Sequence, residues 1–548
     1  METFRWVRRV AGLLIALWLV YYLVIYVGHA QALLRFPYDY DQGEGYDVNS
    51  AWVLSWGGSI YASPSQYPYY SSNYPPLYPL LLAPFVAAWG PQLALGRLLS
   101  LIATAFTVGL IGFAVYLEPL NINPPSRLRF ASSADKQRAD LCSMALESRR
   151  WRPALAAALL FIASPYVYHT TPLARVNALM VALALGGVYA VSQGAEQQDG
   201  KAWGWLAAGG ALLLAALYTK QMAIDAVAAA LTYLALRNWQ RGLTLGAAIL
   251  GAGGAIYLAL EVGTRGGFSL NVLWANANPF DWQQAEAYYR NFLTIHLLLV
   301  VAGVALLALP LLRRGPRGIS AYALYFVAAL IVAVGTGKWG AGESYFLSAI
   351  AAGCILLGQA LAWVEATVER TALDMQRQLG KGLPAVAAYS LVFVTCVALT
   401  MQLGRYWHGP SSWPVLGLTD RGIQARVLGR SPAAADTLAG NQIVSYITQT
   451  PGDTLAEECG FTLKAGRPVL GNTTQQLNLY QARRYNPQPL VNALDQGKIS
   501  LVVLNAQRYP APVLAAIGRD CNAVASYTIN GFDYRVLQCH CAQASSGR

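Results

Sequence analysis

Four carboxylates lie within nine residues of one another near the start of the chain. They are Asp39, Asp41, Glu44 and Asp47, directly after the first apolar run. Like charges this close repel one another, and ionised groups beside a membrane are costly, so some of these carboxyl groups should hold their protons more tightly than usual. Such a carboxylate suits a general base or a metal site. The alternative is a solvated acidic loop, and the surroundings must decide between the two.

Aromatic residues follow the acidic segment at close spacing. Trp52 and Trp56 come first, then residues 67–70 and 73–79 bring a run of tyrosines and prolines that includes Tyr74. Aromatic rings can stack on the faces of sugars, but Tyr and Trp also gather at membrane interfaces without binding a ligand. By themselves, these residues favour an interfacial belt.

Membrane helices are the elements that must position these side chains. The chain of 548 residues is 55% hydrophobic and 12% charged, whereas soluble domains carry about 25% charged residues. A membrane helix needs about 20 mostly apolar residues. Eleven runs approach this length: 9–28, 93–117, 153–169, 174–192, 203–219, 221–236, 242–262, 292–312, 318–335, 344–363 and 385–403. The first has no small-residue cleavage site and predicts an uncleaved anchor, and the short run 77–88 predicts an interfacial or re-entrant helix.

The distribution of basic residues predicts the topology. With the N-terminus in the cytoplasm, nineteen Lys and Arg residues fall in cytoplasmic segments and seven on the opposite side, as the positive-inside rule requires. The acidic segment then belongs to an extracytoplasmic loop of about residues 29–92. The net charge of +12 therefore reflects cytoplasmic loops and predicts no nucleic-acid partner. We expect a multi-pass protein of the cell (plasma or inner) membrane with an extracytoplasmic C-terminus.

The C-terminal tail predicts a second, soluble domain. Residues 1–403 form the membrane domain, and residues 404–548 are long enough for a core of their own. Strand-like runs at 498–505 and 527–537, with a helix-like segment at 489–496, indicate a small α/β domain. The expected fold class is thus mainly α, a polytopic helical bundle with a C-terminal extracytoplasmic α/β domain.

Four of the seven cysteines lie in the tail. Cys459, Cys521, Cys539 and Cys541 should form disulfides in an oxidising compartment, and three pairings are possible. A reduced, buried Cys459 is compatible with this prediction. A zinc site at Cys539-His540-Cys541 is less favoured, because the usual gap between ligands is missing.

The loop resembles the first large loop of bacterial GT-C glycosyltransferases, such as protein O-mannosyltransferases and the lipid A aminoarabinose transferase. The similarity rests on the acidic segment, a Gly-x-x-x-Tyr stretch at 57–61 and Tyr-Pro-Pro-Leu-Tyr at 74–78. Further similar segments lie at 164–166, 175–177, 217–221 and 340–347, so the resemblance covers roughly the first 400 residues. It implies a GT-C bundle of about 11 helices. Many relatives have adjacent acids, whereas Gln42 and Gly43 separate Asp41 from Glu44 here.

The resemblance implies a function. A sugar would move from a polyprenyl-phosphate donor to a hydroxyl of a glycan, lipid or protein acceptor on the extracytoplasmic face, with inversion. The base would be Asp41 or, failing that, Glu44. Cations near the lipid boundary would neutralise the departing phosphate, although each could equally reach toward lipid headgroups. The expected substrate-binding residues are Asp39, Tyr74, His169, Arg175, Lys220, Arg290, Lys338 and Glu343.

Several alternatives remain open at the level of sequence. A transporter or flippase would place charges at the bilayer midplane, where only Asp225 and Glu261 are candidates. An oligosaccharide ligase or polysaccharide polymerase would move a whole glycan. No cofactor is expected; a divalent metal on the acidic cluster is possible but not favoured. The tail could position the acceptor, or it could be a lid that only stabilises the helices.

Overall fold

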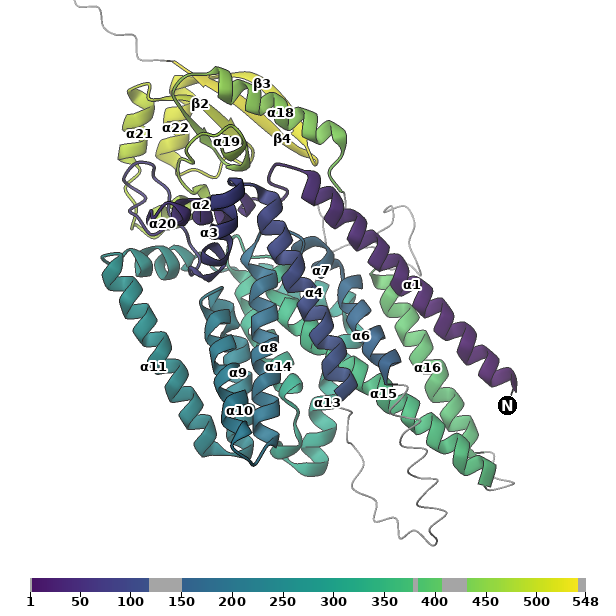
Figure 1. The fold of residues 1–548 in the computed structure, drawn as a ribbon. Helices are drawn as coiled ribbons and strands as arrows, with labels where there is room; N and C mark the ends of the chain where they lie inside the picture. Colours follow the sequence, from purple (N-terminus) through teal and green to yellow (C-terminus); the bar gives the residue numbers. More distant parts are fainter. Residues whose placement is uncertain (1, 118–149, 378–382, 407–430, 541–548) are drawn as a thin grey trace, which may run out of the picture.

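The protein forms a long helical bundle with a small mixed domain at one end (Figure 1). The computed structural model describes residues 2–117, 150–377, 383–406 and 431–540. The first half of the bundle contains α1 (Glu2–Arg35), α2 (Glu44–Ser55), α3 (Leu77–Trp89), α4 (Leu93–Leu117), α6 (Trp151–Ala163), α7 (Pro165–Thr170), α8 (Val176–Glu196) and α9 (Lys201–Leu217). The second half contains η1 (Gln221–Ala223), α10 (Ile224–Arg237), α11 (Trp239–Gly263), η2 (Ser269–Leu273), η3 (Trp274–Asn276), α12 (Trp282–Ile295), α13 (Leu297–Arg314), η4 (Pro316–Gly318), α14 (Ala321–Val332), η5 (Ala333–Gly337), η6 (Glu343–Phe346), α15 (Leu347–Arg377) and α16 (Leu383–Arg405).

Six helices in the described part of the chain are long and apolar enough to cross a membrane. They cover Arg9–Arg35, Leu93–Leu117, Val176–Glu196, Trp239–Gly263, Leu297–Arg314 and Glu343–Val368. Shorter apolar helices occupy Leu77–Trp89, Trp151–Ala163, Lys201–Leu217, Ala321–Gly337 and Ser390–Arg405. The prediction of a mainly helical, polytopic bundle is confirmed.

One predicted span is interrupted. The run 153–169 forms two helices, α6 and α7, which meet at Ser164 in an extended conformation (φ −61°, ψ 129°). Pro165 follows Ser164, and a proline lacks the backbone N–H that would continue the helix and disfavours the helical conformation of the residue before it. After the break, α7 contains His169, and the segment that follows α7 leads to Arg175. Both residues line the cavity described below.

The C-terminal domain is built around a four-stranded sheet in the order β1-β2-β4-β3. Strands β1 (Asp453–Ala456) and β2 (Ile499–Leu504) are parallel, whereas β3 (Cys521–Ile529) and β4 (Phe532–Cys539) form an antiparallel hairpin. The helices are α18 (Ala434–Gln449), α19 (Gly460–Lys464), α20 (Thr473–Gln481), α21 (Gln488–Asp495) and α22 (Ala511–Asp520). All of β2 is buried, which explains its unbroken apolar run. The predicted α/β domain is thus confirmed.

The prediction of a single strand over 527–537 is wrong. This segment contains the end of β3, a turn and the start of β4. Asn530 and Gly531 both have positive φ values, +52° and +87°, as the two central residues of a tight hairpin turn require. The Asn-Gly pair is the sequence signal that identifies this turn.

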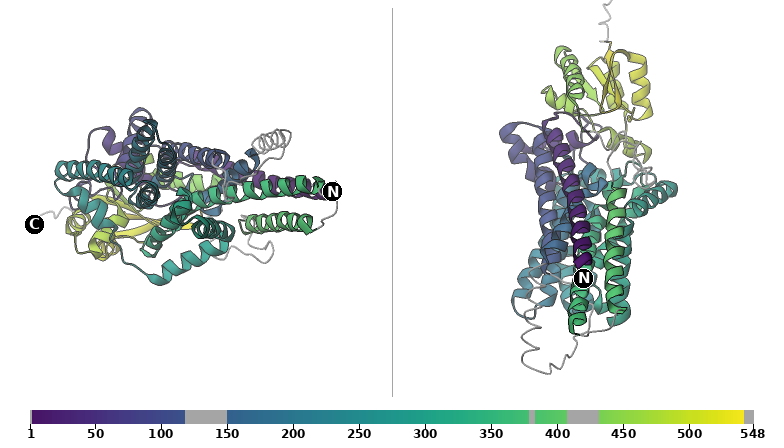
Figure 2. Two further views of the ribbon diagram at one scale, coloured as in Figure 1. Left: turned by 90° about the horizontal axis from the view of Figure 1, so that it is seen from below. Right: turned by 90° about the vertical axis from the view of Figure 1, so that its right-hand side faces the viewer.

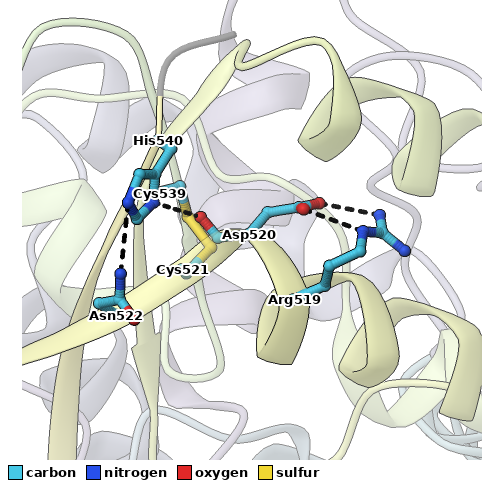
Figure 3. The surroundings of a disulfide bond; sticks show 6 residues. All are labelled: Arg519, Asp520, Cys521, Asn522, Cys539 and His540. Carbon is cyan, nitrogen blue, oxygen red and sulfur yellow. Dashed lines mark hydrogen bonds and ion pairs between the residues drawn. A yellow bond between two sulfur atoms is a disulfide. The ribbon is translucent and has the colours of Figure 1, made fainter.

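A disulfide joins the outer ends of β3 and β4. Cys521 and Cys539 are paired in register with a Cα–Cα distance of 3.9 Å and form the bond (Figure 3). Cys459 is buried as a free thiol, and Cys541 lies outside the described residues. His540, a residue of the less favoured zinc-site hypothesis, interacts with the carbonyl of Asp520 and with Asn522 (Figure 3).

The C-terminal domain covers the end of the bundle opposite the start of α1 (Figures 1 and 2). Its core includes residues of the first loop: Phe36 and Tyr38 are buried in one cluster with Phe461 and Tyr534. The rings of Tyr38 and Phe461 lie 5.1 Å apart, and a Cβ on Gly440 would stand 2.1 Å from the Tyr38 ring. Because loop and domain share this core, the position of the acidic segment depends on both.

Candidate active site

A cavity of about 920 Å³ lies where the first loop, the helix bundle and the C-terminal domain meet. The first loop and the start of α8 contribute Asp41, Asp47 and Arg175, and the connection after α9 contributes Lys220. The η5–η6 region contributes Lys338 and Glu343, and the C-terminal domain contributes Asn478 and Arg508. Charged side chains from segments far apart in sequence therefore face one hollow.

Glu44 does not line this cavity. It forms a buried ion pair with Arg97, and both of its carboxylate oxygens are fully hydrogen-bonded. Both side chains are fully buried. Glu44 Oε1 accepts hydrogen bonds from Arg97 Nε (2.8 Å) and Ala174 N (2.7 Å). Glu44 Oε2 accepts hydrogen bonds from Arg97 Nη2 (2.7 Å) and Tyr40 N (2.8 Å). Burial disfavours the ionised form, but Arg97 and the two backbone N–H groups hold the pKa of Glu44 below its ordinary value. Glu44 is thus occupied in organising the loop.

Arg97 uses all of its donors in the same place. Its Nη1 donates to the carbonyls of Leu33 and Phe36, both at 2.5 Å, and its Nη2 also donates to Tyr38 O at 2.7 Å. The last carbonyls of a helix have no partner within the helix, and Leu33 lies in the last turn of α1. Arg97 therefore ends α1, fixes the chain that leaves it and holds Glu44 at the same time.

Asp41 faces the cavity beside Arg175. Arg175 Nη1 lies 3.1 Å from Asp41 Oδ2 and donates to the carbonyl of Gln42 at 2.6 Å. Its Nε lies 3.2 Å from Asp47 Oδ2, and its Nη2 donates to the Tyr74 hydroxyl at 3.2 Å. Asp41 lines the cavity and keeps 43% of its side chain exposed. Burial within the site raises its pKa, although Arg175 opposes this. Burial also raises the pKa of Asp47, to about 7.

Gly43 makes the close approach of Arg175 possible. Its φ is +119°, and a Cβ at this position would stand 2.0 Å from Arg175 Nη1. A side chain would thus be strained by the backbone and would displace the guanidinium. The Gln-Gly spacing between Asp41 and Glu44 lets one carboxylate turn toward the cavity while the other stays buried.

Lys220 lies deep in the wall of the cavity. Its ammonium group donates to Asn177 Oδ1 at 2.7 Å and lies 5.7 Å and 5.0 Å from the centres of the Tyr74 and Tyr345 rings. Burial and the neighbouring Arg175 lower the pKa of Lys220 to about 7. An incoming anion would restore the charge of this ammonium, as expected of an anion-binding lysine.

His169 and Glu343 form a pair across the cavity wall. His169 Nδ1 contacts Glu343 Oε1, and both side chains are mostly buried. They come from α7 and η6, and the sequence analysis expects both residues to bind substrate. In the described part of the chain, no group of three His, Cys, Asp or Glu side chains is arranged to hold a metal ion.

Three other candidates lie in different settings. Asp39 is buried and accepts from Gly45 N (2.6 Å) and Gly460 N (2.7 Å), so it ties α2 to the C-terminal domain. Burial and the neighbouring Glu44 raise the pKa of Asp39 to about 6. Arg290 is exposed on α12 and pairs with Glu286 at 2.5 Å. Lys338 lines the cavity.

Sequence reasoning missed three residues of this region. Arg97 was counted among the basic residues without a role, although an arginine one turn into an apolar helix is itself a signal of a buried partner. Gln42 and Arg508 meet at the cavity, where Arg508 Nη1 contacts Gln42 Oε1. Nothing in the tail sequence distinguishes Arg508 from its other arginines.

One family model and several solved structures are similar to this chain. The family model described as dolichyl-phosphate-mannose-protein mannosyltransferase matches residues 145–262, and no curated protein sequence matches the chain. The crystal structure of ArnT from Cupriavidus metallidurans in the apo state has a TM-score of 0.54 and 14% identity, covering 97% of this chain and 99% of that one. ArnT bound to undecaprenyl phosphate gives a TM-score of 0.49 at 14% identity, covering 97% and 99%.

A third similar structure is the archaeal oligosaccharyltransferase AglB from Archaeoglobus fulgidus, in complex with an inhibitory peptide and a dolichol-phosphate. It has a TM-score of 0.49 and 11% identity, covering 96% of this chain and 75% of that one. The similarity to apo ArnT extends over nearly the whole of both chains. The chain therefore has the same overall fold as apo ArnT.

Proposed function

We propose that this protein transfers a sugar from a polyprenyl-phosphate donor to an acceptor hydroxyl, with Asp41 as the general base. The observation that carries the proposal is the position of Asp41 in the cavity, beside Arg175. A carboxylate for proton transfer and cations for a phosphate are the two requirements of this reaction. The family model that matches residues 145–262 is named for an activity with a lipid-phosphate-linked sugar, which supports the same donor class.

The reaction is a single displacement. The acceptor oxygen attacks the anomeric carbon, the bond from that carbon to the phosphate oxygen breaks, and the electron pair leaves with the polyprenyl phosphate. Asp41 takes the hydroxyl proton as the new glycosidic bond forms. One carboxylate is enough, because an inverting displacement forms no covalent sugar-enzyme intermediate.

Lys220 and Arg175 would neutralise the departing phosphate. Lys220 is held by Asn177 and two aromatic rings and lies next to Arg175. Fixed cations stabilise the charge that develops on a leaving group without the cost of reorganising water. Phosphate binding would also favour the protonated form of Lys220, so binding and leaving-group stabilisation reinforce each other.

Glu44 is not proposed as the base. Each of its oxygens already accepts two hydrogen bonds, and it is separated from the cavity by the residues that hold it. The sequence analysis left Asp41 and Glu44 as alternatives for the base. Asp41 is preferred because it is accessible from the cavity and Glu44 is not.

The proposed orientation has the N-terminus in the cytoplasm and the cavity on the extracytoplasmic side. Its support is the excess of Lys and Arg in the connections assigned to the cytoplasm. A disulfide in the C-terminal domain fits an oxidising compartment as well. The donor would then enter from the bilayer and the acceptor from outside.

Transfer assays with purified protein test the proposal. Polyprenyl-phosphate monosaccharides are offered with candidate acceptors, and mass spectrometry should detect the addition of one sugar. We expect Asp41→Asn to lower kcat by about 10²- to 10⁴-fold with an unchanged melting temperature. Glu286→Gln, an exposed carboxylate on α12, is the matched control and should retain full activity.

Three outcomes would contradict the proposal. Full activity of Asp41→Asn would remove its base. Transfer of a whole glycan would identify a ligase or polymerase, and counterflow of lipid or solute into vesicles without any covalent product would identify a transporter.

A further inference from the structure

A short loop of the C-terminal domain is fixed by one buried carboxylate. Glu457 is 2% exposed, and its Oε2 accepts from the backbone N–H groups of Asn505 (2.5 Å), Ala506 (2.8 Å) and Gln507 (3.1 Å). Its Oε1 accepts from Arg508 N. Four N–H groups thus bind the carboxyl group of Glu457, and these hydrogen bonds hold the backbone at Arg508 in one position.

This loop lies where ligands usually bind in sheets of this kind. Glu457 follows β1, and residues 505–508 follow β2, its parallel neighbour. The carboxyl ends of parallel strands are the common binding edge of α/β sheets. Here that edge faces the membrane domain, because Arg508 and residues of α20 line the cavity.

The side chain of Arg508 meets the first loop next to Asp41. Its Nη1 contacts Gln42 Oε1. Gln42 is also bonded to α20, through Thr473 Oγ1 at 2.9 Å and Thr474 Oγ1 at 3.3 Å. Gln42 is the residue next to Asp41, the proposed base. The C-terminal domain therefore contacts Gln42 from two sides, through Arg508 and through α20.

The charge of Arg508 is not neutralised by a carboxylate within ion-pair distance among the described residues. The nearby Glu458 is bonded to the Tyr534 hydroxyl (2.5 Å) and the Asn505 amide (3.1 Å). Burial, with the charge of Asp39, raises the pKa of Glu458 to about 8, although Arg508 opposes this. By contrast, two carboxylates accompany Arg175.

From this geometry we infer that Arg508 binds an oxyanion of a substrate and makes the C-terminal domain part of the active site. The chemistry is a phosphate or carboxylate held by a guanidinium, which can donate two parallel hydrogen bonds to either. The oxyanion belongs to the donor lipid or to an anionic acceptor. The inference rests on the proposed transferase function. Under this inference the C-terminal domain takes part in substrate binding and is not only a lid that stabilises the helices.

Substitution of Arg508 in the full-length protein tests this inference. We compare Arg508→Gln and Arg508→Lys with Arg519→Gln. Arg519 is an exposed arginine of the same domain that pairs with Asp495 and with Asp520, as Figure 3 shows for the latter. Transfer assays give KM for donor and acceptor separately. We expect Arg508→Gln to raise one KM by about 10- to 100-fold, as for loss of a charge-assisted hydrogen bond, with partial recovery in Arg508→Lys and no change in Arg519→Gln.

The arms of the experiment separate the possible results. A higher KM for the donor assigns the oxyanion to the lipid phosphate, and a higher KM for the acceptor assigns it to the acceptor; both support the inference. Binding of undecaprenyl phosphate to purified protein is measured in parallel, so a defect in Arg508→Gln would support the inference even if no transfer is detected. Unchanged lipid binding, with both KM values within twofold of the parent or with no transfer detected, would overturn it.

Discussion

Two arginine-carboxylate pairs in the same loop serve different purposes. Glu44 and Arg97 are fully buried, and they make two and three hydrogen bonds to backbone groups, respectively. Asp41 and Arg175 lie 3.1 Å apart, and Asp41 lines the cavity with 43% of its side chain exposed. A buried carboxylate with all its acceptor positions filled is inert, whereas a partly exposed one can still receive a proton. Accessibility, not residue type or spacing, separates the structural pair from the chemical one.

The largest expected effect comes from breaking the buried pair. Arg97→Leu leaves the charge of Glu44 buried without its partner and frees three backbone carbonyls. We expect a loss of about 3–5 kcal/mol in the free energy of unfolding, seen as a large fall in melting temperature in detergent. Arg290→Leu removes an exposed pair instead and should change stability by less than about 1 kcal/mol. Equal melting temperatures for the two variants would remove the distinction between the pairs.

A smaller effect should follow from moving Arg175 relative to Asp41 without removing either charge. Gly43→Ala places a Cβ in contact with Arg175 Nη1 and should shift the guanidinium away from Asp41. We expect kcat/KM to fall by about 10- to 100-fold, as for a small misplacement of catalytic groups. Gly57→Ala is the control, because Gly57 also has a positive φ (+80°) but open space at its Cβ. If both variants lose the same activity, backbone strain rather than the position of Arg175 is responsible.

The smallest effect is a pH dependence. The pKa of Lys220 is lowered from 10.5 to about 7, so the free protein loses this cation as the pH rises through neutrality. If the charge assists the departing phosphate, kcat/KM should fall about fivefold between pH 7 and pH 8. Lys220→Arg keeps a positive charge at all these pH values and should abolish the alkaline fall. A parent pH profile that is flat above pH 7 would exclude this role.

Much of the fold could be predicted from composition and apolar runs. The long helices near residues 9–28, 93–117 and 242–262 were predicted because about 20 apolar residues in a row have few alternatives to a membrane span. The buried strand Ile499–Leu504 was predicted from its apolar run in the same way. The break at Pro165 and the turn at Asn530-Gly531 were missed, although the residues that cause them can be read in the sequence.

The candidate site was predicted less completely. Asp41, Tyr74, His169, Arg175, Lys220, Lys338 and Glu343 all line the cavity, because charged residues at helix ends on one side of a bundle come together. Arg290 lies on an exposed helical face, which spacing alone does not reveal. The contribution of Arg508 depends on how the C-terminal domain sits on the first loop, and no local pattern encodes that.

The residue types alone indicate that the chain spans a membrane, that an acidic loop follows its first helix, and that a small α/β domain follows the bundle. These properties follow from residue types over short windows. Only the tertiary structure decided which carboxylate is free to react. Arg97 lies 53 residues from Glu44, and Arg175 lies 134 residues from Asp41. The ionisation and accessibility of a carboxylate depend on the groups that surround it in space, and here those groups come from distant segments.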